Sequence, residues 1–284
     1  MSTVITLTTD FGLADAYVAV MKGVILGINP DTQIVDICHT IKPQDVTQAS
    51  FILSTAHRFF PERTIHLVVV DPGVGSQRRA IILRTPSADF IAPDNGVLSY
   101  ILHDFIPIPR QKPTEQEQIK LPAELEAVTI TNPEFWRSPV SPTFHGRDIF
   151  APVAAHLSLG VPPADFGEKI TSLTMLPLRQ PSRKDDGSLA GNIIYIDHFG
   201  NLITSIRSED LPPQEETISI EVGGQRIKGL SRTYAEGTGL IALTGSSGYL
   251  EVSLKEGNAR DFLNINIGDE IIIRRWSTHN DVVR

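Results

Sequence analysis

Residues 70–79, VDPGVGSQRR, combine residue types that can do chemistry. An apolar run ends in Asp71, two glycines separated by one residue follow, and two arginines close the stretch. An acid and an arginine on one loop can orient a water or polarise a reacting group. Two closely spaced glycines can also cradle a phosphate or form an ordinary turn.

The residues around the glycines argue against a phosphate-binding loop. A dinucleotide-binding loop needs glycine where this chain has Arg78, and a nucleoside triphosphate loop ends in Gly-Lys-Ser or Gly-Lys-Thr. The following segment, RRAIILRT (78–85), is typical of a strand, so no helix N-terminus is available to bind an anion. We therefore interpret Pro72 and the glycines as a tight turn that brings Asp71 and Arg78 to one edge of a sheet. This disfavours a dinucleotide-dependent oxidoreductase.

Acidic residues also follow other apolar runs in the first half of the chain. Asp10 comes after VITLTT, and Asp36 lies within QIVDI, shortly before His39. Ligands of open α/β sheets bind beyond the carboxyl ends of the strands, which makes these carboxylates candidate ligand contacts. Each is equally well explained as a turn or capping residue.

Three further segments concentrate polar residues. In 143–148, TFHGRD, His145 shares a loop with Arg147 and Asp148, and Asp148 is as well explained as a helix cap. The segments 197–201, DHFGN, and 244–249, TGSSGY, have the composition of turns between strands. The eight histidines are scattered without any recognised ligand spacing, so we expect no metal site.

Strands alternate with helices in the first half, which predicts a doubly wound, mainly parallel α/β domain. TIHLVVV (64–70) shows no alternation, as in a parallel strand covered on both faces. Residues 105–142, rich in proline and glutamate, predict a long surface excursion, and 148–160 predict a helix that ends at glycine. The other expected elements are strands at 4–8, 33–37, 80–84 and 89–93 and helices at 15–28 and after Asp45.

The second half of the chain has a different pattern of residues. Residues 177–189, PLRQPSRKDDGSL, are polar and contain prolines, as in a linker. Short β-like runs with glycine-containing turns follow, which predict a smaller all-β barrel. We therefore predict an α/β domain at 1–176, a linker at 177–189 and a β-barrel domain at 190–284.

Composition narrows the functional classes. The chain has 284 residues, a formal net charge of -8 and 41% hydrophobic residues, a balance that argues against nucleic acid as a partner. A single cysteine permits no intrachain disulfide. No secretory signal and no apolar run of about 18 residues is present, so we expect a cytoplasmic protein without a membrane partner.

Seven segments, taken in order, resemble the signatures of one family. They are TTDFGLADAYVAVMKGVI (8–25), HTIKPQDVTQA (39–49), VVDPGVGSQRRAI (69–81), APDNGVL (92–98), FHGRDIFAPVAAHL (144–157), IDHFGN (196–201) and TGSSGYLEV (244–252). The family is the S-adenosylmethionine hydroxide adenosyltransferases, also called adenosine-forming S-adenosylmethionine hydrolases. They are related to fluorinating and chlorinating enzymes that act on the same substrate.

The resemblance implies a fold, a reaction and an assembly. Members of the family have an N-terminal α/β domain and a C-terminal β-barrel domain. Water or hydroxide attacks the ribose 5′ carbon of S-adenosylmethionine, giving adenosine and L-methionine without a metal or redox cofactor. The members form homotrimers, and the substrate binds between the N-terminal domain of one subunit and the C-terminal domain of its neighbour.

The resemblance also assigns the groups around the attacking water to Asp71, Arg78 and His145, and leaves open which of them takes the proton. In the fluorinating relatives the positions that match Asp71 and His145 look like tyrosines, and the position of Tyr17 is serine. We therefore favour hydrolysis. The alternatives are a 5′-halogenase of the same family and a non-catalytic module that binds S-adenosylmethionine or adenosine.

The remaining substrate contacts are also carried over from the resemblance. Asp10 matches the carboxylate that holds the ribose hydroxyls, and Asp15 is a second acid of the same motif. Asp197 matches the residue that binds the methionine ammonium, and Asn201 the residue that meets the adenine edge.

Serines and a tyrosine complete the predicted substrate site. Ser246 and Ser247 match the pair that holds the methionine carboxylate, although the halogenating relatives have arginine at the second position. Tyr234 matches the aromatic residue that stacks on adenine.

Overall fold

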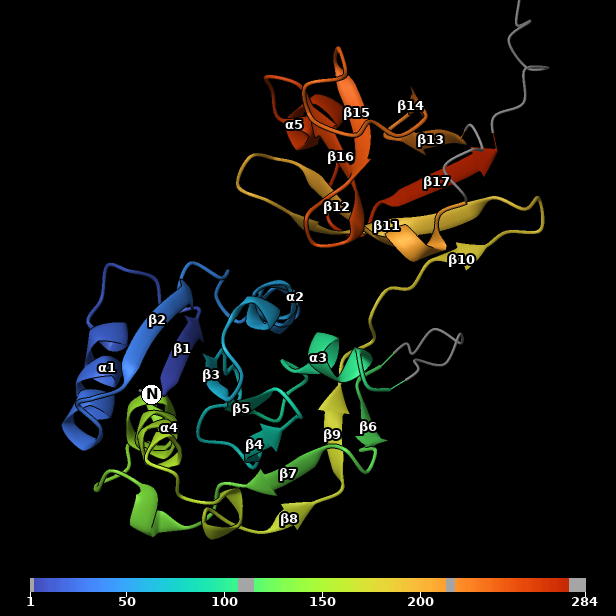
Figure 1. The fold of residues 1–284 in the computed structure, drawn as a ribbon. Helices are drawn as coiled ribbons and strands as arrows, with labels where there is room; N and C mark the ends of the chain where they lie inside the picture. Colours follow the sequence, from blue (N-terminus) through green and yellow to red (C-terminus); the bar gives the residue numbers. More distant parts are fainter. Residues whose placement is uncertain (1–2, 107–114, 213–217, 276–284) are drawn as a thin grey trace, which may run out of the picture. The chain divides into compact units, whose positions relative to one another are not determined.

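The computed structural model describes residues 3–106, 115–212 and 218–275. The chain forms two compact units, Met1–Leu178 and Arg179–Arg284, which we call the N-terminal unit and the C-terminal unit. Figure 1 colours the first from blue to yellow-green and the second from yellow to red. Each unit has its own sheet and its own core.

A mixed sheet with the strand order β2-β1-β3-β5-β4-β7-β8 forms the centre of the N-terminal unit. β2, β1, β3 and β5 pair in parallel, and the pairings from β5 through β8 are antiparallel. The strands are β1 (Val4–Thr9), β2 (Gln33–Cys38), β3 (Thr64–Val69), β4 (Ala80–Arg84), β5 (Ala88–Pro93), β7 (Glu126–Thr129) and β8 (Lys169–Ile170), and a separate pair is β6 (Glu117–Lys120) with β9 (Ser172–Met175).

This sheet confirms the predicted α/β class, with the parallel pairing confined to one half. The chain passes from β4 to β5 through residues 85–87 alone. So short a connection permits only an antiparallel pair, because a parallel crossover needs a dozen or more residues.

Helices cover both faces of the sheet, as a doubly wound fold requires. The core on one face contains side chains of α1 and α4, and the core on the other contains side chains of α2 and α3. β3 supplies Leu67 and Val69 to the first core and Val68 to the second, and Val70, the residue after the strand, also packs in the second. The helices are α1 (Tyr17–Ile28), α2 (Val46–Ala56), α3 (Ser99–His103) and α4 (Ala151–Ser158).

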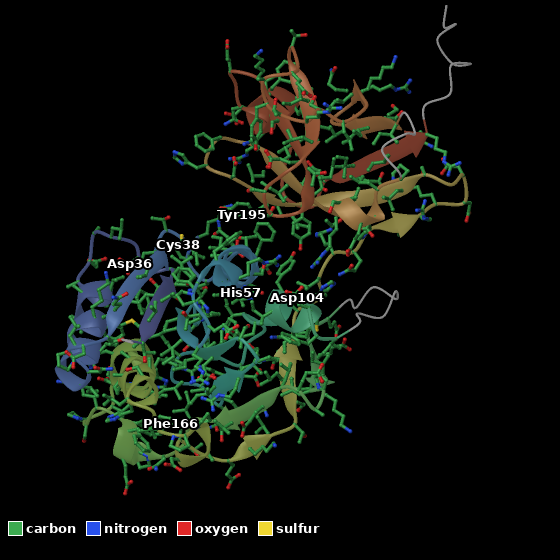
Figure 2. All side chains as sticks on the ribbon, viewed as in Figure 1. Asp36, Cys38, His57, Asp104, Phe166 and Tyr195 are labelled. Atoms are coloured by element: carbon green, nitrogen blue, oxygen red, sulfur yellow. The ribbon has the colours of Figure 1, made fainter. Side chains whose placement is uncertain are left out.

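Local signals explain where two of these helices begin. Asp45 caps α2, because its side chain accepts a hydrogen bond of 2.8 Å from the amide of Gln48, as the sequence predicted. The predicted helix at 148–160 is divided: a π-helical turn spans Gly146–Phe150, and α4 continues from it. Phe166, labelled in Figure 2, is fully buried in the core that α4 covers.

The prediction that residues 105–142 form a surface excursion is wrong for much of that segment; 107–114 lie outside the described residues. β6 and β7 both lie within it. β7 pairs with β4, and its Ala127 and Val128 are each 1% exposed. A four-residue strand is too short to show periodicity, so its pairing depends on the exposed edge of β4 rather than on a local pattern.

The C-terminal unit is an eight-stranded antiparallel sheet that nearly closes into a barrel, which confirms the predicted all-β fold. Its main order is β14-β13-β17-β11-β12-β16-β15, its end strands β14 and β15 contact each other, and β10 pairs with β11. The elements are β10 (Ser182–Arg183), β11 (Leu189–Ile196), β12 (Leu202–Arg207), β13 (Ile218–Val222), β14 (Gln225–Lys228), β15 (Leu240–Thr244), β16 (Tyr249–Leu254), α5 (Ala259–Leu263) and β17 (Glu270–Arg275).

None of the helices in the described parts of the chain has the length and apolar character needed to span a membrane.

Candidate active site

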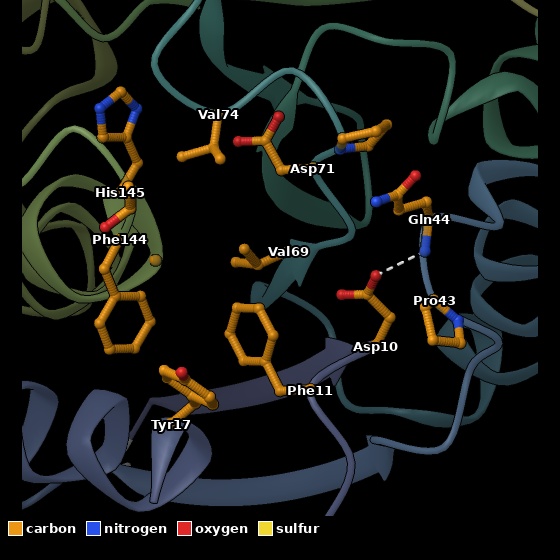
Figure 3. Close-up of a pocket in the computed structure, with 13 residues that line it drawn as sticks. Asp10, Phe11, Tyr17, Pro43, Gln44, Val69, Asp71, Val74, Phe144 and His145 are labelled. Carbon is orange, nitrogen blue, oxygen red and sulfur yellow. Dashed lines mark hydrogen bonds between the residues drawn. The ribbon is translucent and has the colours of Figure 1, made fainter. Parts of the chain in front are cut away.

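A pocket of about 370 Å³ lies at the carboxyl ends of β1 and β3. This is the edge where an open α/β sheet binds its ligands. Figure 3 shows His145 and Phe144 on one side of the pocket and Asp10 on the other. The polar residues that line it include Asp10, Gln44, Asp71, Thr143 and His145.

Asp71 and Arg78 form a nearly buried ion pair beside this pocket. Arg78 Nε donates to Asp71 Oδ1 at 2.9 Å and Oδ2 at 3.0 Å, and Nη2 also donates to Oδ2. The side chain of Arg78 is only 11% exposed, and that of Asp71 only 6%. The Arg78 guanidinium also lies over the ring of Phe150, 5.3 Å from its centroid. Such fork-like contacts are typical of an ionised carboxylate paired with arginine.

The same Arg78 nitrogen holds His145. Nη2 lies 2.9 Å from His145 Nδ1. Because a guanidinium can only donate, Nδ1 must accept, and the proton of a neutral ring then resides on Nε2. Burial, followed by the charge of Arg78, lowers the pKa of His145 below its usual 6.5, which favours this neutral form. The structure thus brings together the acid, the arginine and the histidine that the sequence had suggested.

The three residues do not face the pocket equally. Asp71 and His145 line it, whereas Arg78 does not. Arg78 therefore acts on the pocket through its two partners: it fixes the orientation of the carboxylate and the tautomer of the imidazole.

The glycine loop forms the expected turn, and it also makes a tight contact with the histidine loop. The amide of Val74 donates to the carbonyl of Asp71 at 3.2 Å, and that of Ser76 to Gly73 at 3.0 Å. Gly75 has φ +78°, and a Cβ there would lie 2.6 Å from the carbonyl oxygen of Pro142. Glycine is required because both the left-handed backbone and the close approach exclude a side chain.

Asp148 anchors the segment that carries His145, and it is not the helix cap that the sequence suggested. Its carboxylate is fully buried and accepts hydrogen bonds from Arg147 Nε at 2.7 Å and from the amide of Ser141 at 2.8 Å. Burial raises its pKa, but these hydrogen bonds and the nearby arginines outweigh burial and lower the pKa overall. Asp148 lies in the π-helical turn, a feature that is frequent at functional sites.

Aromatic side chains form a second wall, of which only Tyr17 had been named from the sequence. The rings of Phe11 and Tyr17 lie 5.6 Å apart, those of Phe11 and Phe144 5.8 Å, and those of Tyr17 and Phe144 5.2 Å. All three line the pocket. Phe11 and Phe144 adjoin Asp10 and His145 in sequence, so their position next to candidate polar residues was the available signal.

The two predicted N-terminal binding acids differ in position. Asp10 lines the pocket, and its Oδ2 accepts a hydrogen bond of 2.7 Å from the amide of Gln44. Asp15 is exposed and does not line the pocket.

Asp197 and Asn201 lie on one turn of the C-terminal unit and bind each other. Asn201 Nδ2 donates to Asp197 Oδ2 at 2.8 Å, while Oδ1 accepts from the amides of Phe199 at 2.9 Å and Asn201 at 2.8 Å. The turn thus fixes the orientation of the Asp197 carboxylate.

The remaining predicted residues belong to the same unit, and Tyr234 binds its buried acid Glu251. Tyr234 is 50% exposed and donates its hydroxyl to Glu251 at 2.7 Å. Burial, followed by this hydrogen bond, raises the pKa of Tyr234 to about 12, and the charge of Asp197 contributes to the increase. Ser246 is exposed and Ser247 half-buried, on a turn closed by a hydrogen bond of 2.9 Å from the Gly248 amide to the Gly245 carbonyl.

Across the described ranges, the His, Cys, Asp and Glu side chains nowhere gather in threes with the geometry to hold a metal ion. The expectation that the protein needs no cofactor stays a prediction.

Two family models match this chain, one in each unit. The family model described as SAM hydroxide adenosyltransferase N-terminal domain, where SAM is S-adenosylmethionine, matches residues 5–167. The corresponding C-terminal domain model matches residues 191–272. The first model thus matches the α/β unit and the second matches the β unit that follows it. The chain belongs to the SAM hydroxide adenosyltransferase family.

Relatives with assigned names span most of the chain. The (R)-S-adenosyl-L-methionine hydrolase of Salinispora tropica is 34% identical over 268 residues, which cover 94% of this chain and 96% of the relative. The protein of the same name from Thermus thermophilus is 36% identical over 267 residues, which cover 92% of this chain and 95% of the relative. A fluorinase from Nocardia brasiliensis is 30% identical over 234 residues, which cover 73% of this chain and 72% of the fluorinase.

A solved structure shows the same fold. The crystal structure of an uncharacterized conserved protein from Thermotoga maritima is similar to this chain with a TM-score of 0.82 and 36% identity. The match covers 95% of this chain and 100% of the other.

Replacing Gly75 with alanine should separate His145 from Arg78, because the new Cβ collides with the Pro142 carbonyl. Gly187→Ala is a matched control: Gly187 has φ +79°, but nothing lies within 4 Å of its Cβ position. NMR titration of the imidazole should show the pKa of His145 moving up towards 6.5 in Gly75→Ala and unchanged in Gly187→Ala. Identical His145 titrations in both variants would contradict this role of the close approach.

Proposed function

We propose that the protein hydrolyses S-adenosylmethionine to adenosine and L-methionine by attack of water or hydroxide on the ribose 5′ carbon. The observation that carries this proposal is the cluster of Asp71, Arg78 and His145, two members of which line the pocket. Relatives named (R)-S-adenosyl-L-methionine hydrolase support it over nearly the full chain.

The chemistry needs a nucleophile rather than an acid. The sulfonium of S-adenosylmethionine leaves as a neutral thioether, so no proton has to be delivered to the leaving group. What the site must do is hold a water in line with the breaking C–S bond, and such positioning can contribute about 7–11 kcal/mol.

The hydrogen-bond directions divide the work among the three residues. His145 Nδ1 is occupied by Arg78, so Nε2–H is a donor that can orient a water oxygen. Asp71 keeps lone pairs beyond those that bind Arg78, so its carboxylate is the acceptor for a water hydrogen and then for the proton released. Arg78 touches neither the water nor the substrate in this scheme and is a positioning residue.

Charge at the pocket favours the substrate and disfavours the alternative nucleophile. Phe11, Tyr17 and Phe144 line the pocket, and aromatic rings attract a cation such as a sulfonium. A halide would instead meet the oxygens of the Asp71 carboxylate, which can accept a hydrogen from water but offer no donor to an anion, so a 5′-halogenase is the less supported alternative. A non-catalytic binding module would have no use for a set that orients water.

Substrate recognition would use Asp10 for the ribose hydroxyls, as a carboxylate suits two neighbouring donors. Asp15 would act from outside the pocket. In the C-terminal unit, Asp197 would bind the methionine ammonium and Asn201 the adenine edge.

The other contacts of the C-terminal unit would complete the substrate site. Ser246 and Ser247 would bind the methionine carboxylate, and the half-exposed ring of Tyr234 would stack on adenine.

We further propose a cytoplasmic homotrimer in which the C-terminal unit of one subunit completes the pocket of its neighbour. Support comes from the family resemblance, which implies a homotrimer with sites between subunits, together with the match of both domain models of that family. Light scattering of the purified protein should give three times the mass of 31.2 kDa. A mass of one chain under conditions of full activity would contradict the shared site.

Incubation with S-adenosylmethionine in ¹⁸O-labelled water tests the reaction directly. Attack at carbon 5′ should place the label in the 5′-hydroxyl of adenosine, measured by mass spectrometry, alongside unlabelled methionine. Release of adenine, adenosine without label, or no product would contradict the proposal.

In the same assay, Asp71→Asn should lower kcat by about 10²–10⁴-fold, the usual contribution of a general base. Asp89→Asn is a matched control, because Asp89 also pairs with an arginine, Arg84, at 2.7 Å but does not line the pocket. Equal rates for the two variants would exclude Asp71 as the acceptor of the proton.

The rate should fall in acid as His145 becomes protonated. Protonated Nδ1 would be a donor that faces the Arg78 donor, so the contact is lost below the pKa of His145. Because that pKa is lowered from 6.5, the site stays intact at pH 6.5 and fails only at lower pH. A profile of kcat/KM against pH should show this limb, and His145→Gln should remove it. In His156→Gln, a control outside the pocket, the limb should be unchanged.

A further inference from the structure

A buried histidine connects the edge strand β2 to the end of β1. His39 is 4% exposed; its Nε2 lies 3.0 Å from Asp36 Oδ1, and its Nδ1 lies 2.9 Å from Thr9 Oγ1. Asp36, labelled in Figure 2, also accepts a hydrogen bond of 2.6 Å from Lys22. Asp36 and His39 both stood out in the sequence, and the proposed reaction uses neither of them.

The Asp36 carboxylate sets the direction of these contacts. It lies 3.0 Å from His39 Nε2 as a charge contact without hydrogen-bond geometry, and it favours the tautomer with the proton on Nε2. In that tautomer Nδ1 accepts from the Thr9 hydroxyl. The Thr9 oxygen in turn accepts from the amide of Phe11 at 3.3 Å, so the contacts run from the Phe11 amide through Thr9 and His39 to Asp36.

A β-bulge makes this chain possible. β1 and β2 pair Leu7 with Asp36 and Thr8 with Cys38, which leaves Ile37 as an extra residue. Residues three apart in a regular strand point to opposite faces. The extra residue resets this alternation, so that the side chains of Asp36 and His39 meet and His39 comes level with Thr9.

Asp36, His39 and Thr9 have the composition of a nucleophilic triad, but Thr9 cannot act as one. Its side chain is fully buried, so no substrate can reach the hydroxyl. What the chain of hydrogen bonds does is hold the backbone of residues 10–12. The Phe11 amide is bound by Thr9, and the Gly12 amide donates to the carbonyl of His39 at 2.7 Å.

The held segment forms one end of the pocket. Asp10 and Phe11 both line it, and the carboxylate of Asp10 is tied from the other side by the Gln44 amide. Both amides that follow Asp10 are therefore bound by Thr9 or His39. A carboxylate on a backbone fixed in this way needs no reorganisation when a ligand arrives.

We propose that Thr9, His39 and Asp36 are positioning residues that preset Asp10 and Phe11 for the ribose of the substrate. This inference rests on the proposed function, in which Asp10 binds the ribose hydroxyls. It predicts that the hydroxyl of Thr9 matters for binding of the adenosyl group and has little effect on the chemical step.

Thr8 provides a matched control on the same strand. Thr8 and Thr9 are both fully buried, but Thr8 Oγ1 has no hydrogen-bond partner among the residues described. Thr8→Val and Thr9→Val each remove one buried threonine hydroxyl. Only the hydroxyl of Thr9 belongs to the chain of hydrogen bonds. Thr9→Ser keeps the hydroxyl and is the conservative variant.

The test measures adenosine binding by calorimetry, with KM, kcat and Tm for each variant. Thr9→Val should raise the Kd for adenosine and KM by about 5- to 10-fold, the effect of one lost hydrogen bond, and change kcat by less than about 2-fold. Thr9→Ser should restore wild-type binding, and Thr8→Val should bind as the wild type does. Equal Kd values for Thr8→Val and Thr9→Val, or a lower Tm in Thr9→Val with Kd unchanged, would overturn the inference.

Two substitutions of His39 keep the test decisive if Thr9→Val does not fold. Asparagine retains an acceptor near the Nδ1 position for Thr9, whereas glutamine retains a donor near the Nε2 position for Asp36. His39→Asn should therefore bind adenosine more tightly than His39→Gln, and the opposite order would contradict the inference. A wild-type protein that neither binds adenosine nor consumes S-adenosylmethionine would instead refute the proposed function.

Discussion

The Nη2 group of Arg78 donates to Asp71 and to His145, two side chains from segments far apart in the sequence. This double contact is the interaction on which the candidate site depends. It orients the carboxylate, adds to burial in lowering the pKa of the imidazole, and decides which nitrogen of the ring carries the proton. A lysine could neutralise Asp71 but could not present the planar fork that orients both partners at once.

The rest of the N-terminal unit serves to bring those two segments together. Gly75 lets the glycine loop approach the carbonyl of Pro142, and Asp148 holds the same segment through the amide of Ser141. The ends of β1 and β3 supply the other side of the pocket. The site is thus built from loops, but each loop is fixed by a contact with a backbone group, which moves less than a side chain.

The sequence could reveal contacts that are local and could not reveal those that join distant segments. Asp71 and Arg78 share one turn, so their meeting followed from turn chemistry alone. His145 stood out in its own loop, but only the family resemblance joined it to Asp71 and Arg78, because no local pattern shows which loop will meet another. Phe11 and Phe144 were missed for the same reason, and β7 was missed because its pairing with β4 is a tertiary contact.

Charge connects the site to the order of events in the proposed reaction. The ion pair with Arg78 neutralises Asp71 and His145 is neutral, so Asp10 and the aromatic rings dominate what a bound sulfonium would experience. Both attract a cation, and the rings have much less attraction for a neutral thioether. Breaking the C–S bond removes the positive charge, so the same groups that draw the substrate in would release methionine once the chemistry is done. Asp10 would keep hold of the ribose hydroxyls, which makes adenosine the product expected to leave last.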